Sequence, residues 1–167
     1  MKAIVCVDKN WAIGLNDKLL FDIKEDLLHF KKLTINKVCV MGYNTYKSLP
    51  NGALKNRTNV VLTSKQISID GAVVCNNVKE LDSFLKNYDS NDVFVIGGQQ
   101  IYKLLLSHCQ EAIVTKIEQE KNANKFFPNL DNLKNWTLKQ KAELKNEDNL
   151  PASILIYKNI DVKKALC

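Results

Sequence analysis

Short apolar runs rich in β-branched residues recur along most of the chain, with polar or helical patterns between them. Some of them, such as residues 93–96 (Val-Phe-Val-Ile), are apolar at every position, as expected for strands that helices cover on both faces. The alternation of strands and helices predicts an α/β fold with a mostly parallel central sheet. The predicted strands are residues 3–7, 38–41, 59–63, 72–75, 93–96 and 112–117.

The pattern changes after Pro128. Residues 136–144 and 153–157 have the pattern of two longer strands joined by the polar turn 145–149, which predicts an antiparallel hairpin at the end of the fold. The central sheet would then have about eight strands, flanked by helices. Because 167 residues suit one hydrophobic core, we expect a single domain over residues 1–160 and a short tail over residues 161–167.

The apolar runs span only about five to seven residues, well short of the roughly 18 that a membrane-spanning helix needs. The chain begins with a short apolar segment that leads directly into Asp8 and Lys9, unlike a signal peptide. We therefore expect a cytoplasmic protein with no membrane contact, and we expect a monomer.

The cysteines indicate neither a disulfide framework nor a metal site. There are five of them, an odd number, and none is spaced as C-x-x-C or grouped with His29 or His108. Cys6, Cys39 and Cys75 lie inside apolar runs, where a thiol behaves as a small buried hydrophobic group. We expect reduced thiols and no bound metal.

The formal net charge of +6 is spread along the whole chain, with no basic block beyond Lys163 and Lys164. This distribution disfavours a nucleic-acid partner and is compatible with a positive field that collects anionic small molecules. Arg57 is the only arginine among 24 basic residues. Since lysine cannot reproduce the planar fork that binds a carboxylate through two hydrogen bonds, Arg57 is a candidate carboxylate-binding residue, although chance could also explain it.

The first predicted helix carries an inward-facing carboxylate. We expect Asp22 to cap this helix, with Glu25 three residues later, and the apolar stripe then runs through residues 23, 27, 30 and 34. Asp26 falls on the same side as this stripe. A buried and unpaired carboxylate costs several kcal/mol, so Asp26 is either neutralised by a structural partner or kept for chemistry.

Two glycine turns follow predicted strands. Gly97-Gly98 comes after residues 93–96 and opens a helical run, and Gly42 comes after residues 38–41. Such turns let backbone N–H groups approach a phosphate, but the G-x-G-x-x-G dinucleotide fingerprint is absent, so a purely structural turn is the alternative. Both turns should lie at the carboxyl ends of strands, where open α/β sheets bind their ligands.

Taken together, these segments resemble the dihydrofolate reductase family through about Tyr157. The matching motifs, in order, are Ile4-Val5-Cys6-Val7-Asp8, Ile13-Gly14, Asp26-Leu27 with Phe30-Lys31, Met41-Gly42 with Thr45, Arg57-Thr58-Asn59-Val60-Val61-Leu62-Thr63, Val95-Ile96-Gly97-Gly98 with Ile101-Tyr102, Thr115, and Phe127-Pro128. The resemblance implies an enzyme that uses NADPH to reduce 7,8-dihydrofolate by hydride transfer to C6 and protonation at N5. It also implies that antifolate inhibitors bind the same site.

The resemblance assigns roles to individual residues. Asp26 would bind the pterin and support protonation, with Thr115 linked to it and Phe21 beside it. Segment 14–19 would be a mobile loop that closes over the nicotinamide. The substrate site would comprise Ile4, Val5, Cys6, Leu27, Phe30, Leu49, Leu54, Arg57 and Ile96. The cofactor site would comprise Cys6, Ile13, Gly14, Gly42, Asn44, Thr45, Leu62, Thr63, Ser64, Lys65, Gly97, Gly98, Gln99, Gln100, Ile101 and Tyr102.

The chain departs from the family pattern at three places, one of which is Cys6, where alanine is common. Leu20-Phe21 stands where Pro-Trp is usual, and Tyr43-Asn44 replaces basic residues that often touch cofactor phosphates. Ser64 and Lys65 remain as expected partners of a 2′-phosphate, which favours NADPH over NADH. Two alternatives stay open: a pyrimidine reductase of riboflavin synthesis with the same fold, and a non-catalytic nucleotide- or polyanion-binding module.

Overall fold

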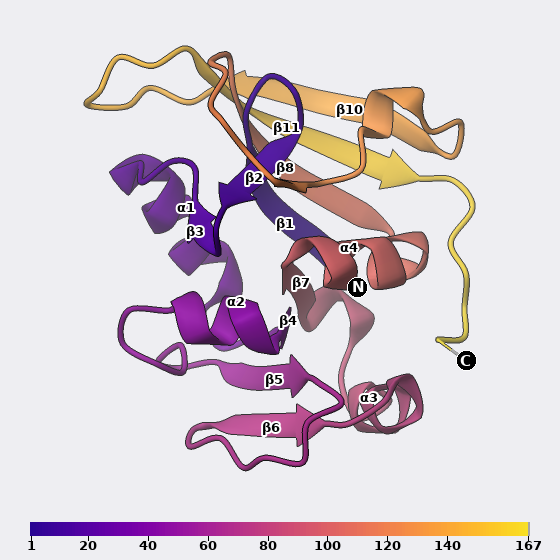
Figure 1. Cartoon of the computed structure of the whole chain (residues 1–167). Helices are drawn as coiled ribbons and strands as arrows, with labels where there is room; N and C mark the ends of the chain where they lie inside the picture. The colour runs from indigo at the N-terminus through magenta and orange to yellow at the C-terminus, as the bar shows by residue number, and fades with distance from the viewer. Residues whose placement is uncertain (167) are drawn as a thin grey trace.

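The computed structural model describes residues 1–166, which form an α/β fold around an eight-stranded sheet (Figure 1). The strands lie in the order β10-β11-β8-β1-β7-β4-β5-β6, and all neighbours are parallel except the pairs that β11 makes with β8 and β10. The predicted fold class and its C-terminal hairpin are therefore confirmed. The strands are β1 (Lys2–Val7), β4 (Val38–Gly42), β5 (Thr58–Leu62), β6 (Ala72–Cys75), β7 (Val93–Gly97), β8 (Glu111–Ile117), β10 (Trp136–Glu143) and β11 (Ala152–Asn159).

Helices and a second, small sheet complete the described part of the chain. The helices are α1 (Lys24–Thr34), α2 (Tyr43–Ser48), α3 (Val78–Leu85) and α4 (Gln99–Leu105), with short 3-10 turns at Ser90–Asp92, Leu106–His108 and Leu130–Asn132. The small antiparallel sheet has the order β3-β2-β9, from β2 (Ala12–Leu15), β3 (Lys18–Leu19) and β9 (Lys125–Phe126). No helix within residues 1–166 is long and apolar enough to cross a membrane.

Strand β1 lies in the middle of the large sheet and is buried on both faces. Because successive side chains of a strand point to opposite faces, Ala3, Val5 and Val7 pack in the same cluster as buried side chains of α3 and α4. Ile4 points the other way and packs in a cluster that includes Phe30 of α1. Figure 1 shows α1 and α4 on either side of this strand. The two-sided burial explains the continuous apolar runs in the sequence.

The first helix begins differently from the prediction. Its N-terminal cap is Ile23, which is 2% exposed, has extended backbone angles and provides no side-chain hydrogen bond. The predicted cap, Asp22, is exposed and lies one residue too early. Burial of Ile23 among apolar side chains such as Phe21 and Ile117 therefore determines where the helix starts, in place of side-chain capping.

The segment predicted as a loop over residues 14–19 is part of a β-hairpin. Gly14 pairs with Leu19, and the turn residues Asn16 and Asp17 both have positive φ angles, 49° and 62°. Two consecutive residues of this kind form the tight turn that matches the twist of paired strands. A Cβ atom on Gly14 would meet the carbonyl oxygen of Lys18 at 2.8 Å, so the hairpin needs glycine here.

The C-terminal tail packs against the domain. The backbone N–H of Lys163 donates to the carbonyl oxygen of Ser107 at 3.0 Å, and the carbonyl of Lys163 lies 3.1 Å from Nδ1 of His108. Leu166 packs against the largest core cluster. The last residue of the predicted tail, Cys167, lies outside the described residues.

Replacing a buried leucine should destabilise this fold far more than replacing an exposed one. Leu81 of α3 is fully buried, whereas Leu28 of α1 is 56% exposed. We expect Leu81→Ala to lower the free energy of unfolding by about 2–5 kcal/mol, because it leaves a cavity in the core. Leu28→Ala should change it by no more than about 0.5 kcal/mol. Urea denaturation of both variants checks this, and equal losses would contradict the described packing.

Candidate active site

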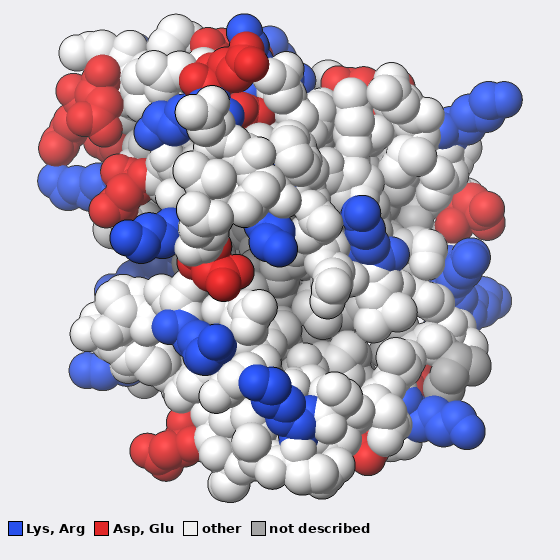
Figure 2. Space-filling view, in the orientation of Figure 1, with Lys and Arg blue, Asp and Glu red and all other residues white. Residues whose placement is uncertain are grey.

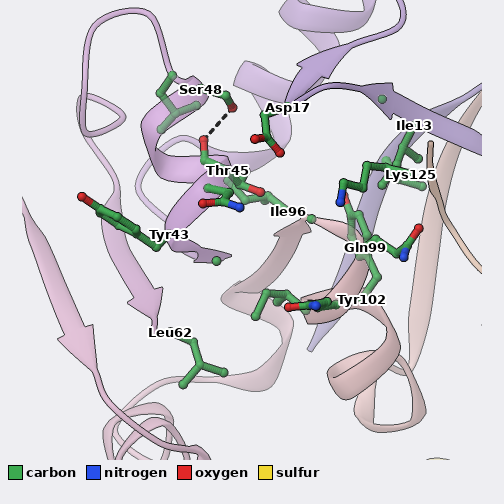
Figure 3. A pocket seen from close by; sticks show the side chains of 18 of the residues that line it. Ile13, Asp17, Tyr43, Thr45, Ser48, Leu62, Ile96, Gln99, Tyr102 and Lys125 are labelled. Atoms are coloured by element: carbon green, nitrogen blue, oxygen red, sulfur yellow. Dashed lines mark hydrogen bonds between the residues drawn. The ribbon is translucent and has the colours of Figure 1, made fainter. Parts of the chain in front are cut away.

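A cavity of about 870 Å³ lies at the carboxyl ends of the parallel strands. Its walls come from β1, the ends of β4, β5 and β7, helices α1, α2 and α4, and the β2–β3 hairpin. Figure 2 shows a hollow in the middle of this face with basic side chains, Lys or Arg, around it, and Figure 3 shows the cavity from close by. The volume falls within the range of cavities that bind cofactors and drug-sized ligands.

Asp26 brings a carboxylate to the half of the cavity that α1 lines. Burial raises the pKa of Asp26 above its ordinary value, because a carboxylate loses hydration there. Hydrogen bonds from the Thr115 hydroxyl and the Cys6 thiol, and the nearby His29, act in the opposite direction. Thr115 is 2% exposed and lies on β8, beside Cys6 of β1 in the sheet. Two neighbouring strands therefore hold the carboxylate in place.

The other titratable groups around Asp26 are held in their neutral forms. Burial raises the pKa of the Cys6 thiol, and the nearby Asp26 raises it further, so Cys6 is a hydrogen-bond donor and a poor nucleophile. Burial also lowers the pKa of His29, which favours its uncharged form. Nε2 of His29 is buried and has no hydrogen-bond partner among the described residues. Asp26 is thus the acidic group here whose neutral form burial favours, while its hydrogen-bond partners favour the charged form.

Arg57 lies at the opposite edge of this half of the cavity and is oriented by its neighbours. Its Nε donates to Oγ1 of Thr34 at 3.0 Å, and its Nη1 donates to the carbonyl oxygen of Lys55 at 3.0 Å. The guanidinium also lies 5.8 Å from the ring centroid of Phe30, which is a cation–π distance. These contacts leave one N–H of Nη1 and both of Nη2 for a ligand, enough for a paired contact to a carboxylate.

The other half of the cavity has the donor groups that a dinucleotide needs. The turns after β4 and β7 lead into α2 and α4, and neither helix has a side-chain cap, so first-turn N–H groups face the cavity without a side-chain acceptor. Gly97 has a φ of 117°, an angle that other residues rarely adopt, and its peptide bond to Gly98 is cis. Hydroxyl and amide side chains also line this half: Asn44, Thr45, Thr63, Ser64, Gln99 and Gln100. The donor set fits a phosphorylated dinucleotide.

Tyr43, which stands where the family often has a basic residue, is flanked by two lysines. The ammonium groups of Lys47 and Lys65 lie 5.3 Å and 5.0 Å from the centroid of its ring. An aromatic face attracts cations, so Tyr43 holds these two charges close together. Positive charge at this end of the cavity therefore comes from lysines gathered on an aromatic ring.

A family model described as dihydrofolate reductase matches residues 1–159. The chain belongs to the dihydrofolate reductase family. Among curated relatives, it is 30% identical over 165 residues to the dihydrofolate reductase of Bacillus subtilis, covering 97% of this chain and 96% of that protein. It is 31% identical over 147 residues to the one from Buchnera aphidicola of Schizaphis graminum, covering 87% and 90%.

A solved structure shows the same fold. It is a dihydrofolate reductase from Enterococcus faecalis, complexed with NADP(H) and the compound RAB-propyl. The two chains superpose with a TM-score of 0.86 at 28% sequence identity, and the match covers 96% of each chain. The family expectation drawn from the sequence motifs is therefore confirmed.

Most of the residues predicted for the dihydrofolate reductase site come together around one cavity. Every predicted substrate residue lines it, and so does every predicted cofactor residue except Gly97, which ends β7. Tyr102 uses its hydroxyl to donate a 2.7 Å hydrogen bond to the carbonyl oxygen of Ile4, one of the predicted substrate residues. Their roles as ligand contacts stay predictions.

Of the predicted catalytic residues, Asp26 lines the cavity and Thr115 reaches it through Asp26. Phe21 does not line it. The Phe21 ring is 8% exposed and packs in a separate cluster with Ile117, while the ammonium group of Lys121 lies 4.4 Å from its centroid. Lys121 also donates to the carbonyl of Leu20 at 2.7 Å, so it holds both residues that replace Pro-Trp.

The cavity also contains residues that the sequence did not point to. Asn76 and Asn77 follow β6 at its carboxyl end. The turns after β4 and β7 were identified by the same position after a strand, but those turns contain glycine and the turn after β6 does not. Lys125 comes from β9, a strand that the sequence analysis missed. The further residues of this kind are Tyr43, Ser48, Pro50 and Val78. Asp17, Lys18 and Leu19 also line the cavity, and they belong to the segment 14–19 that was predicted to close over the nicotinamide.

Asp26→Asn should stabilise the ligand-free protein at neutral pH. The pKa of Asp26 is about 3.9 in the unfolded chain and is raised in the folded protein. As the pH rises from the unfolded pKa through the folded pKa, the unfolded chain loses its proton more readily, so the folded protein loses stability. An amide does not ionise, so the variant avoids this cost above that window, and the two proteins should converge in acid. Urea midpoints of both proteins at pH 7 and in acid measure the difference. A variant less stable than the parent at pH 7 would contradict the assigned pKa direction.

Proposed function

We propose that this chain reduces 7,8-dihydrofolate to 5,6,7,8-tetrahydrofolate with NADPH, and so supplies reduced folate for one-carbon metabolism. The observation that carries the proposal is the half-buried carboxylate of Asp26 in a cavity whose other half has the donors of a dinucleotide site. Membership of the dihydrofolate reductase family supports both the substrate and the cofactor of this proposal. The Enterococcus faecalis relative, which is complexed with NADP(H), supports the choice of cofactor.

The cofactor residues are those of the donor-rich half. Thr63, Ser64 and Lys65 follow β5, and Lys65 also contacts Tyr43, so this end offers hydroxyls and positive charge to a 2′-phosphate. The turns after β4 and β7 offer N–H groups to the remaining phosphates. When bound, NADPH supplies the hydride. The residues of the chain orient the reactants and exclude water around them.

The substrate residues form an apolar slot with one charged group at each end. Leu27, Phe30, Leu49 and Leu54 line its walls, and Leu27 remains 46% exposed because it faces the open cavity. Arg57, oriented by Thr34, binds the α-carboxylate of the glutamate tail. Asp26, at the other end, binds the pterin and assists the delivery of a proton to N5.

Absorbance of the reduced nicotinamide provides the direct test. Its loss should depend on dihydrofolate, with a higher kcat/KM for NADPH than for NADH. The same assay with the ribosylamino pyrimidine of riboflavin synthesis tests the related reductase activity, for which we expect no turnover. Turnover of the pyrimidine and none of dihydrofolate would refute the proposal, and so would ligand binding without any turnover.

We also infer the ligands, location and assembly of this protein. We expect antifolate inhibitors to compete with dihydrofolate for the slot, and we expect no nucleic-acid or membrane partner. The cysteines at 6, 39, 75 and 109 are free thiols, which supports a reducing compartment such as the cytoplasm. The exposed large apolar residues come from many different elements, which supports a monomer. Sedimentation of the purified protein measures its assembly.

Asp26→Asn should lower turnover of dihydrofolate by about 10² or more near neutral pH, because an amide keeps the shape but cannot support protonation at N5. The variant should regain rate in acid, where the substrate takes its proton from solvent. In the parent, the rate should fall as the pH rises past the apparent pKa of the complex. Steady-state pH profiles of both proteins measure this, with the Kd for NADPH as the control for intact folding. Turnover within threefold of the parent at pH 7 would refute the mechanism.

Arg57→Lys should weaken dihydrofolate binding by more than about 1 kcal/mol and change saturated turnover less. The reason is that lysine offers a point charge in place of a paired, planar contact to the carboxylate. Lysine would also lose the contacts that Arg57 makes with Thr34 and Lys55. Equilibrium titration with dihydrofolate measures the change, and unchanged affinity would remove Arg57 from the substrate site.

A further inference from the structure

Lys125 is a cationic residue of the cavity that contacts neither the substrate slot nor the site of the 2′-phosphate in the proposed function. The cationic lining residues are Lys18, Arg57, Lys65 and Lys125. Arg57 lies beside Phe30 in the substrate half, and Lys65 lies against Tyr43 at the far end of the cofactor half. Lys125 enters from β9, a third and separate element.

The turns around Lys125 provide no positive side chain of their own. The turn after β4 continues with Tyr43, Asn44 and Thr45, and the turn after β7 continues with Gln99 and Gln100. Neutral groups can donate hydrogen bonds to a phosphate but do not neutralise its charge. A pyrophosphate in this part of the cavity would therefore need a cation from another segment.

Lys125 is placed to provide that cation. Its backbone pairs with Gly14 of β2, and its side chain extends over Gln99 into the cavity (Figure 3). No carboxylate of the described residues lies within ion-pair distance of its ammonium group, although six other lysines do make ion pairs. Asp17 and Lys18, at the tip of the neighbouring hairpin, also line the cavity and offset each other's charge.

The residues on both sides of Lys125 hold its backbone in position. The backbone N–H of Asn124 donates to the carbonyl oxygen of Gly14 at 3.1 Å, and its side chain exchanges hydrogen bonds of 3.0 Å and 3.2 Å with Asn16. On the other side, the backbone N–H of Phe126 donates to Oε1 of Gln99 at 2.6 Å. One set of contacts reaches the hairpin and the other reaches the first turn of α4. A backbone anchored in this way needs no further ordering when the lysine binds a ligand.

We propose that Lys125 binds the pyrophosphate of the dinucleotide cofactor, a role that rests on the proposed function. A dinucleotide with its 2′-phosphate near Ser64 and Lys65 must cross the start of α4 to bring its nicotinamide to the strands that carry Ile4 and Ile96. Lys125 lies at this crossing, beside Gly14 and Gln99. Its contact is with the part of the cofactor that NADPH and NADH share.

The test compares the Kd values of NADPH and NADH for single variants at low ionic strength. Lys125→Gln should weaken both cofactors equally, by about three- to tenfold, because both contain the pyrophosphate and the charge is partly exposed. Lys65→Gln should weaken NADPH and leave NADH unchanged. Lys125→Arg, which keeps the charge, should retain most of the affinity. Lys139→Gln removes the same charge from β10, outside the cavity, and serves as the control.

Three results would overturn the role of Lys125. The first is that Lys125→Gln binds both cofactors with unchanged affinity, and the second is that it loses affinity for NADPH alone. The third is that Lys139→Gln loses as much affinity as Lys125→Gln, which would indicate only the general electrostatic field of the protein. A parent protein that bound neither cofactor would overturn the proposed function as well. A parent that bound both and turned over dihydrofolate, with Lys125→Gln unaffected, would overturn the role of Lys125 alone.

Discussion

The parallel pairing of β1 with both β7 and β8 is the constraint on which the rest of the structure depends. It buries β1 on both faces, since Ala3, Val5 and Val7 pack on one side and Ile4 on the other. The carboxyl ends of β1 and β7 then meet at one place, beside the Thr115 side chain of β8. The cavity, the glycine turn and the partners of Asp26 all follow from this arrangement, because each is attached to the end of a strand whose position the pairing sets.

Asp26 shows how the fold maintains a group that it would otherwise disfavour. Burial raises the pKa of its carboxyl, and Thr115 and Cys6 only partly offset that effect. A residue kept for stability alone would be fully satisfied, as Asp8 is: it is completely buried and accepts backbone hydrogen bonds of 2.8 Å and 2.9 Å from Asn10 and Ala12. The contrast between the two carboxylates separates a structural role from a chemical one, and it implies a stability cost at the site of chemistry.

Positive charge around the cavity comes from one arginine and several lysines. The chain has a single arginine, whose guanidinium lines the cavity and keeps N–H groups available for a planar, paired contact to a carboxylate. The other cations of the cavity are lysines that neighbouring groups position. The ring of Tyr43 attracts Lys65, and the contacts of Asn124 and Phe126 fix the backbone of Lys125. The lysine stem is flexible, so this support compensates for the absence of a rigid guanidinium fork.

The sequence by itself determined the strands of the large sheet, their alternation with helices, the C-terminal hairpin and the inward side of Asp26, because these depend on local apolar periodicity. The two glycine turns could also be found, since their residue type signals the backbone they form. Only the tertiary structure decided the rest. The start of α1 depends on burial of Ile23 by Phe21 and Ile117, and β9 forms only by pairing with β2 far away in sequence. The place of Lys125 in the cavity was hidden for the same physical reason, because its neighbours Gly14 and Gln99 are distant along the chain. The link between Thr115 and Asp26 was expected only from the family resemblance, since no local pattern encodes such a contact.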